Sequence, residues 1–520
     1  MRHSVYHDSV TLMRLTRDME AVAGVGRAAV MMGTPPNRAL LAQAGLLAAD
    51  GEAAGPADLV IAVVADSAAA AEAACTAAER ALARRAAPAI VGPARPRTLA
   101  GGQRALPDAT LALISVPGVY AGAEARRALE AGLHVMLFSD NVPIETEIEL
   151  KQLARARGLF LMGPDCGTAI VAGVPLGFAN AVPRGRIGLV AASGTGAQEV
   201  SCRLAAEGEG VSHAIGVGGR DLSDAVGGTM TLAALTALGD DPGTEVVVVI
   251  GKPPGRAVAA RLTQALATLA KPAVVTFPGV DHATGAPTIW TRSPTPPAVL
   301  APPAPAIATL EDAALAAVAL ARGTALRPVE FSRPAAEIER LVAAHAGTLA
   351  PGQRFVRGVY TGGTLAWEAL TLLGARLADV PPDVRGEGSG HRVVDLGDDR
   401  FTVGRPHPMI DGTARQERIA REAGDPATAV LLLDVVLGYG AHADPAAALL
   451  PALSAARRTV TAAGRGLAVV ASVTGTEHDP QVRSRQVAAL QAAGVVVMDS
   501  NAQAARLAAL VAARAGVRER

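Results

Sequence analysis

The sequence predicts an α/β protein made of three doubly wound parallel-sheet modules. Short β-branched runs, such as residues 58–66 and 245–250, alternate with Ala-rich segments of helical spacing, which is typical of βα units on parallel sheets. A Pro-rich stretch at residues 292–306 cannot continue a sheet and predicts a linker. A chain of 520 residues also exceeds one hydrophobic core. Together these observations favour about three domains.

The apolar runs fall into three series that place the modules along the chain. The first series ends with "GLFLMGPD", the second begins with "RIGLVAAS" and ends with "PAVVTFPG", and the third runs from "FVRGVYTGG" to "GVVVMDS". We therefore expect four segments: a module at 1–160, a second at 161–291, the linker with a helical segment at 292–345, and a third module at 346–520. Ligands of open α/β sheets bind beyond the carboxyl ends of the strands, so the loops after strands are the candidate sites.

Composition excludes several classes of function. The formal net charge is +0 and aromatic residues make up 2% of the chain, which disfavours a nucleic-acid partner. No apolar stretch reaches the roughly 18 residues of a membrane span. The first residues, "MRHSVYHDSVTLMRL", lack the apolar region of a signal peptide. The three cysteines are too scattered for a disulfide framework. We expect a cytoplasmic protein with no membrane partner.

Three Gly-rich turns between a strand and a helix are candidate anion sites. The central one is Ser193, Gly194, Thr195 and Gly196, after an apolar strand run. The others are Gly362, Gly363 and Thr364, and Gly438, Tyr439 and Gly440. Glycine lets the backbone approach an anion, and the N–H groups at a helix N-terminus suit a phosphate. The alternative is that these are the tight turns every α/β protein needs. Neither a P-loop nor a dinucleotide motif is present.

Other polar residues are weaker candidates. Residues 404–418 contain Arg405 and His407, the histidine held between two prolines. That histidine could serve as an acid, a base or an anion ligand, or the loop is simply solvated. Cys166 has no neighbouring histidine to activate it. His442 and His478 each precede an Asp-Pro helix start and are expected near helix caps. No spacing of His and Cys matches a zinc site, so no metal is expected.

Several long strings identify a family resemblance. "LMGPDCGT", "IGLVAASGTGAQEV" and "DPGTEVVVVIGKPPG" resemble the α subunit of succinyl-CoA synthetase, and "VLLLDVVLGYG" resembles the carboxyl-terminal domain of its β subunit. "VMMGTPPN", "YTGGTLA" and "DLGDDRFTVGRPHPMID" are similar to the FdrA family of acyl-CoA synthetase-like proteins. The resemblance covers nearly the whole chain apart from the linker. It implies one CoA-binding, Rossmann-like module and two flavodoxin-like modules.

The resemblance also implies a phosphate cradle and shows where this chain departs from it. In the synthetases, one helix N-terminus from each subunit points at one phosphate carried on a histidine. Residues 193–196 and 437–440 match the two loops, so one chain contains both halves. His282 does not stand in the phosphohistidine context, and Lys252 replaces the glutamate that orients that histidine. The ATP-grasp part is missing and the CoA loop is replaced, which leaves CoA as an open alternative.

The implied function is a subunit of an oxamate carbamoyltransferase of allantoin and purine breakdown, which converts oxalurate and phosphate to oxamate and carbamoyl phosphate. In that interpretation residues 193–196 and 438–440 hold phosphate, and Gly362, Gly363 and Thr364 bind the substrate together with Arg405. Lys252 and Arg405 neutralise phosphate or a substrate carboxylate, and His407 is an acid–base candidate. Phosphate or carbamoyl phosphate is then a substrate, and partner subunits of the same pathway are expected. Two alternatives stay open: a subunit of an NDP-forming acyl-CoA ligase, and a non-catalytic scaffold or phosphate-metabolite sensor.

Overall fold

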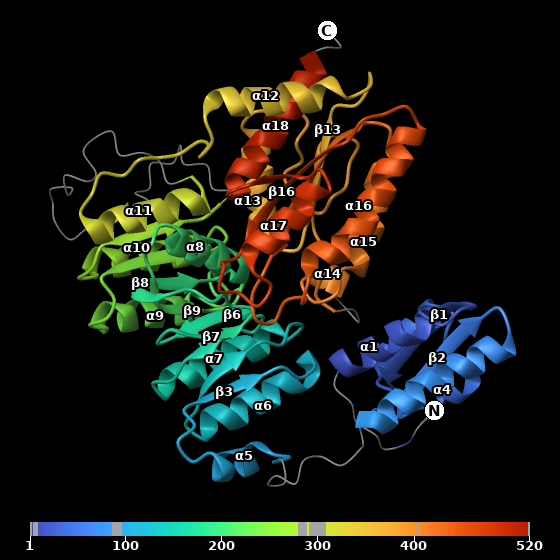
Figure 1. The fold of residues 1–520 in the computed structure, drawn as a ribbon. Coiled ribbons are helices and arrows are strands. Elements are labelled where there is room, and N and C mark those ends of the chain that lie inside the picture. Colours follow the sequence, from blue (N-terminus) through green and yellow to red (C-terminus); the bar gives the residue numbers. More distant parts are fainter. Residues whose placement is uncertain are drawn as a thin grey trace. The chain divides into compact units, whose positions relative to one another are not determined.

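The computed structural model describes residues 3, 9–85, 96–278, 289–290, 308–402 and 406–517 (Figure 1). The linker expected at 292–306, His282 and Arg405 lie outside the described residues. The chain divides into two units, Met1–Arg97 with Thr402–Pro406, and Thr98–Phe401 with His407–Arg520. The α/β class with mostly parallel sheets is confirmed. None of the helices in the described ranges has the length and apolarity to cross a bilayer.

The first unit differs from the expected parallel module. Its two strands, β1 (Val25–Met32) and β2 (Leu59–Ala65), pair antiparallel. The helices are α1 (Ser9–Glu20), α2 (Pro35–Gln43), α3 (Ala49–Glu52) and α4 (Ala68–Arg85). Leu15 and Met19 of α1 and Ala78 of α4 pack with Leu59 in a core of their own. Residues 1–160 therefore do not form one parallel sheet, because this strand pair buries its apolar face on its own two helices.

The second unit begins with a small parallel sheet. Its strands are β3 (Leu111–Ile114), β4 (His134–Leu137) and β5 (Leu161–Met162), in the order β3-β4-β5. The helices α5 (Leu99–Ala105), α6 (Gly118–Glu130) and α7 (Ile144–Ala156) belong to the same region. Val135 and Leu137 of β4 and Leu150 of α7 are buried in a core that continues into the next sheet. Only these three strands of the first expected series are parallel.

The seven-stranded sheet has a flavodoxin-like centre. Strands β8 (Arg184–Ala191), β9 (Val211–Gly216), β10 (Val246–Ile250) and β11 (Ala273–Thr276) are parallel and ordered β11-β10-β8-β9. The helices of this module are α8 (Gly194–Ala206), α9 (Thr229–Asp240) and α10 (Arg256–Thr268). Three edge strands pair antiparallel: β6 (Thr168–Val171), β7 (Val174–Gly177) and β12 (Ile289–Trp290). The β6–β7 hairpin turns at Ala172 and Gly173, both with positive φ, as in a type I′ turn.

The five-stranded sheet is parallel throughout. Its strands are β13 (Phe355–Tyr360), β14 (Arg392–Asp395), β15 (Thr428–Val436), β16 (Ala468–Thr474) and β17 (Val496–Met498), ordered β14-β13-β15-β16-β17. Its helices are α12 (Ala335–Gly347), α13 (Gly363–Gly374), α14 (Asp399–Thr402), α15 (Thr413–Gly424), α16 (Pro445–Ala462), α17 (Arg483–Ala492) and α18 (Asn501–Val517), with α11 (Leu310–Arg322) before them. This 2-1-3-4-5 order is the flavodoxin order.

The two flavodoxin-like modules share one hydrophobic core. Val200 of α8, Ala317 of α11, Leu365 of α13 and Leu507 of α18 belong to the same buried cluster, and Figure 1 shows α11 and α8 side by side. In each module the strand order reverses between the first and third strands, that is, between β8 and β10 and between β13 and β15. Ligands of such sheets bind at this switch point, so a ligand site is expected among the loops that follow these four strands.

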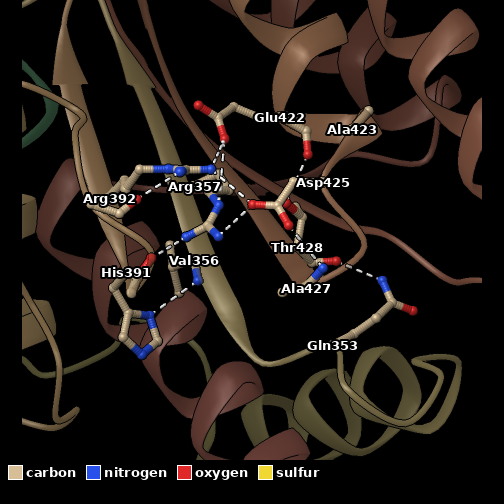
Figure 2. Close-up of polar contacts among 12 residues, drawn as sticks. Gln353, Val356, Arg357, His391, Arg392, Glu422, Ala423, Asp425, Ala427 and Thr428 are labelled. Atoms are coloured by element: carbon tan, nitrogen blue, oxygen red, sulfur yellow. Dashed lines mark hydrogen bonds and ion pairs between the residues drawn. The ribbon is translucent and has the colours of Figure 1, made fainter.

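A buried ion-pair network lies at the amino-terminal ends of the strands of the five-stranded sheet. Figure 2 shows Arg357 of β13 and Arg392 of β14 facing Glu422 and Asp425 at the end of α15. Arg357 Nη2 lies 2.7 Å from Asp425 Oδ2, and Arg392 Nη2 lies 2.8 Å from Glu422 Oε2. Asp425 precedes β15 in the chain, so the network is at the amino end of these parallel strands. It ties strands together and lies away from the switch-point loops.

Candidate functional site

The structure brings two of the three predicted loops into direct contact. Ser193 caps α8, with its Oγ accepting a hydrogen bond from the N–H of Gly196 at 2.9 Å. The same Oγ donates to Thr364 Oγ1 at 2.6 Å. A Cβ added at Gly362 would lie 2.8 Å from Thr195 Oγ1. The N-termini of α8 and α13 therefore meet across the two modules, and glycine at position 362 permits that approach.

An unpartnered hydroxyl lies at the start of α8. Thr168 is 3% exposed, and its Oγ1 is buried without a hydrogen-bond partner among the described residues. A Cβ added at Gly194 would lie 3.3 Å from this oxygen. A buried hydroxyl without a partner costs free energy, whereas an anion at the helix N-terminus would accept its hydrogen bond. The hydroxyl and the first N–H groups of α8 are thus suitable phosphate donors.

The third predicted loop is built differently from expectation. Gly438 has φ +132°, and its N–H donates to Gln481 Oε1 at 3.2 Å. The N–H of Tyr439 donates to the carbonyl oxygen of Ala179 at 3.1 Å, and the Tyr439 side chain is 53% exposed. Helix α16 begins only at Pro445. Two N–H groups expected to hold phosphate thus already have acceptors, and the phosphate role of residues 438–440 stays a prediction.

Asp395 and His407 lie together behind the N-terminus of α13. Asp395 is 5% exposed, and its Oδ1 accepts a hydrogen bond from the N–H of Gly397 at 2.9 Å. A Cβ at Gly363 would lie 2.5 Å from Asp395 Oδ2, and a Cβ at Gly397 would lie 2.7 Å from His407 Nε2. Burial raises the pKa of Asp395 to about 7. This carboxyl therefore exchanges its proton near neutral pH, as a general acid or base must.

His407 is neutral in this environment. Burial lowers its pKa to about 4, and its ring packs against Phe178 with a centroid distance of 5.7 Å. Its Nδ1 accepts a hydrogen bond from the N–H of Met409 at 3.2 Å, which assigns the proton of the neutral ring to Nε2. Nε2 is then a hydrogen-bond donor, so the ring is suited to stabilise an oxyanion and poorly suited to act as a base.

Lys252 follows β10 and faces carboxylates. The side chain is exposed, and its charge opposes the burial-driven rise in the pKa of Asp395 and in that of Asp399. The lysine thus interacts with acidic groups from the β14–α14 region. Its expected role in offsetting phosphate charge stays a prediction.

Sequence reasoning missed the residue that holds the α13 loop. Asp434 of β15 is fully buried and accepts hydrogen bonds from the N–H of Thr361 at 2.9 Å and from that of Gly362 at 2.9 Å. Arg415 Nη2 lies 3.1 Å from Asp434 Oδ1. The available signal was a single aspartate inside the apolar run "AVLLLDVVLGYG", because a charge inside a buried strand needs partners.

Two further candidate residues, Cys166 and His442, lie in environments that the fold itself explains. Cys166 is buried, and burial raises the pKa of its thiol to about 12, so it is no nucleophile at neutral pH. His442 Nδ1 accepts a hydrogen bond from the N–H of Asp444, the cap of α16, which confirms the expected place near a helix cap. Within the part of the chain that the structure describes, no cluster of His, Cys, Asp or Glu could hold a metal ion.

Comparison with known proteins identifies relatives over the full length. YahF of Escherichia coli, an uncharacterised protein, is 38% identical over 528 aligned residues, covering 98% of this chain and 97% of YahF. Residues 359–511 match the CoA-ligase family. The α subunit of the ADP-forming succinate–CoA ligase of Staphylococcus aureus is 31% identical over 172 residues, which is 32% of this chain and 55% of that subunit. This chain belongs to the FdrA-like family of acyl-CoA synthetase-like proteins.

The first unit of this FdrA-like chain has a relative of its own. Residues 1–94 match a family described as the heavy metal-associated domain of AllF. The sequence of this segment contains one cysteine, Cys75, and burial raises the pKa of its thiol. No group of three metal-ligating side chains occurs among its described residues. The part of this segment that the structure describes, residues 3 and 9–85, thus does not fit a bound heavy metal.

Solved structures resemble the FdrA-like chain only distantly. The dinucleotide-forming acetyl-coenzyme A synthetase 1 of Ca. Korarchaeum cryptofilum is 16% identical, with 78% of this chain and 83% of that chain covered and a TM-score of 0.29. The ATP citrate lyase of Methanothrix soehngenii is 18% identical, with coverages of 45% and 38% and a TM-score of 0.33. The family assignment therefore depends on the sequence relatives.

Proposed function

We propose that this protein binds phosphate, or the phosphate group of an acyl phosphate, at the N-terminus of α8 and transfers an acyl group between phosphate and an acceptor. The observation that carries the proposal is the buried Oγ1 of Thr168 beside Gly194, for which none of the described residues supplies a hydrogen-bond partner. The second support is the contact of Ser193 with Thr364, which adds the N-terminus of α13 to the same place. Two helix N-termini contribute about one unit of positive charge there.

The acyl group we propose is carbamoyl, from the resemblance to the FdrA family. A phosphate oxygen attacks the carbamoyl carbon of oxalurate, forming a C–O bond, and the C–N bond breaks to release oxamate. The leaving nitrogen needs a proton, which Asp395, with its pKa raised to about 7, is suited to donate. His407 Nε2 and the helix N–H groups would stabilise the oxyanion on the carbamoyl carbon.

A second candidate is supported by the match of residues 359–511 to the CoA-ligase family. In that case the protein is a subunit of an NDP-forming acyl-CoA ligase, with CoA as a substrate and the ATP-binding domain on another chain. Phosphate at α8 is compatible with both candidates. The two candidate functions differ in whether the reaction requires ATP and CoA.

Incubation of the purified chain with oxalurate and phosphate, with and without the products of neighbouring genes, separates the candidates. We expect ³¹P NMR to show carbamoyl phosphate without ATP or CoA, and to show none with the Gly194→Val variant. Formation of an acyl-CoA that requires ATP and CoA, with no carbamoyl phosphate, would replace the first candidate with the second. The conversion of oxalurate by Gly194→Val at the wild-type rate would exclude a phosphate site at α8.

A further inference from the structure

A cavity of about 400 Å³ lies beside the C-terminal half of α8, where that helix meets β16 and the β16–α17 connection. Cys202, Arg203 and Ala205 of α8 form one wall, and Thr476, His478 and Arg483 form the other. None of the switch-point loop residues lines it. Its volume is in the range of small-molecule sites, roughly 300–1,000 Å³. The cavity is therefore a second place, inside the same unit, where a ligand could bind.

The acidic side chains that line the cavity already have donors. Glu199 accepts hydrogen bonds from Thr474 Oγ1 and from the N–H of Asn501. Glu477 accepts two from Ser484, at 3.0 Å from its N–H and 2.7 Å from its Oγ. Asp499 accepts one from the hydroxyl of Ser332. A cationic ligand would have to compete with these bonds.

The basic side chains, in contrast, retain unused donors. Arg203 is the exception, because its Nη2 lies 3.3 Å from Glu311 Oε1 and its Nη1 donates to the carbonyl oxygen of Asp499 at 3.3 Å. Among the described residues, the only side-chain hydrogen bond of Arg483 runs from its Nε to the carbonyl oxygen of Val473 at 3.1 Å, which leaves both terminal nitrogens. The backbone N–H of His478 donates to Thr476 Oγ1 at 3.2 Å. A guanidinium with free terminal nitrogens pairs well with a carboxylate or phosphate.

We infer that this cavity binds a small anionic molecule, a carboxylate or a phosphate ester, through the terminal nitrogens of Arg483. The apolar part of the ligand packs on Ala181, Pro183 and Ala205, which also line the cavity. The inference is independent of the phosphate site at α8, because the two places share no residue.

Isothermal titration calorimetry on the full chain tests this inference with two probes, succinate for carboxylates and glycerol 3-phosphate for phosphate esters. We expect at least one probe to bind, with affinity falling as salt rises. Arg483→Gln should weaken that binding about tenfold or more, and Ala205→Phe, which fills the cavity, should abolish it. The matched control is Arg485→Gln, on the same helix but paired with Asp444 outside the cavity; it should bind as the wild type does.

The Gly194→Val variant separates this site from the phosphate site. Binding of the probe must survive this change, and its loss would show that the probe occupies the start of α8, which would overturn the inference. Failure of both probes to bind the wild type would overturn it as well. So would equal or tighter binding by Arg483→Gln, because that result would mean that no anion pairs with this guanidinium.

Discussion

Ser193 Oγ and Thr364 Oγ1 are 2.6 Å apart although the two residues are separated by 171 positions in the chain. This bond joins the first turns of α8 and α13, and thereby the switch points of two flavodoxin-like modules. Because Ser193 also caps α8, one hydroxyl serves both the helix and the junction.

A double-mutant cycle on this pair should measure the junction directly. Ser193→Ala should lower the free energy of unfolding by about 0.5–2 kcal/mol, since it removes the cap as well. The double mutant Ser193→Ala/Thr364→Ala, compared with the sum of the two single mutants, should give a coupling energy of about 0.5–1.5 kcal/mol. Urea denaturation supplies the values. Thr98→Ala, which removes only the cap of α5, is the control, and additive effects of Ser193→Ala and Thr364→Ala would mean that the bond contributes nothing.

Gly362→Ala should separate the two loops. The new Cβ would lie 2.8 Å from Thr195 Oγ1 and 2.9 Å from Thr195 Cγ2, closer than side chains pack. We expect a loss of about 1–3 kcal/mol in stability and weaker phosphate binding by calorimetry. Gly347→Ala, where no atom lies within 4 Å of the added Cβ, should instead be neutral or stabilising. Unchanged phosphate affinity in Gly362→Ala would remove α13 from the site.

Asp395 should give the protein a pH-dependent stability. Burial raises its pKa from 3.8 to about 7, so the folded chain keeps a proton that the unfolded chain loses near pH 4. The contribution of Asp395 to the free energy of unfolding is fully present below the pKa of the unfolded chain and is lost as pH rises through the pKa of the folded chain. The loss is roughly 1.4 kcal/mol per pH unit between the two pKa values, a few kcal/mol in total. Urea denaturation at pH 5 and pH 8 should show the decline in the wild type and in the exposed control Asp108→Asn. Burial also raises the pKa of Asp165 to about 7 and that of Glu368 to about 8, so Asp395→Asn should reduce the decline without abolishing it. An undiminished decline in Asp395→Asn would assign the whole effect to these other carboxyls.

Lys252 should affect turnover through the charge balance around Asp395. Lys252→Met removes the cation that opposes the rise in the pKa of Asp395, so the proton is lost at higher pH. The same change removes the cation proposed to offset the charge of phosphate or of a substrate carboxylate, a contact of roughly 2–4 kcal/mol. We therefore expect turnover to slow about 30- to 1000-fold, and Lys252→Glu to be at least as harmful. The pH dependence of kcat/KM should move upward in Lys252→Met. The exposed control Arg256→Gln should not change it, and a wild-type profile in Lys252→Met would place the lysine outside the site.

The sequence was most informative about loops that follow parallel strands. The strand runs before Ser193 and Lys252 are continuous and apolar, and those before Gly362 and Gly438 are interrupted only by Arg357 and Asp434. The structure places all four residues after strands that flank a switch point. Strand direction was harder to predict at the edges. β1 and β2 are as β-branched as parallel strands, and only their pairing shows them to be antiparallel. The composition of a strand does not determine with which neighbour it pairs or in which direction.

The polar interior of the site was the least predictable part. Thr168 and Asp434 stand in the family strings "LMGPDCGT" and "VLLLDVVLGYG", but nothing in those strings predicts what the two side chains contact. Their roles, like that of Phe178, depend on contacts over long sequence separations. The environment of Lys252 was unpredictable for the same reason. Its position after β10 follows from the sequence, but the carboxyl of Asp395 comes from a different sheet. Tertiary packing determines these neighbours, so no local pattern could identify them.

The central claim is that the hydroxyl of Thr168 binds an anion at the start of α8. Calorimetric titration of phosphate and carbamoyl phosphate into the wild type and Thr168→Val tests it most directly, because valine keeps the shape and removes the hydroxyl. We predict that the variant is as stable as the wild type or more so, since an unpartnered buried group is gone, and that it binds about tenfold more weakly. Equal affinity in both proteins, or no binding to the wild type, would contradict the claim.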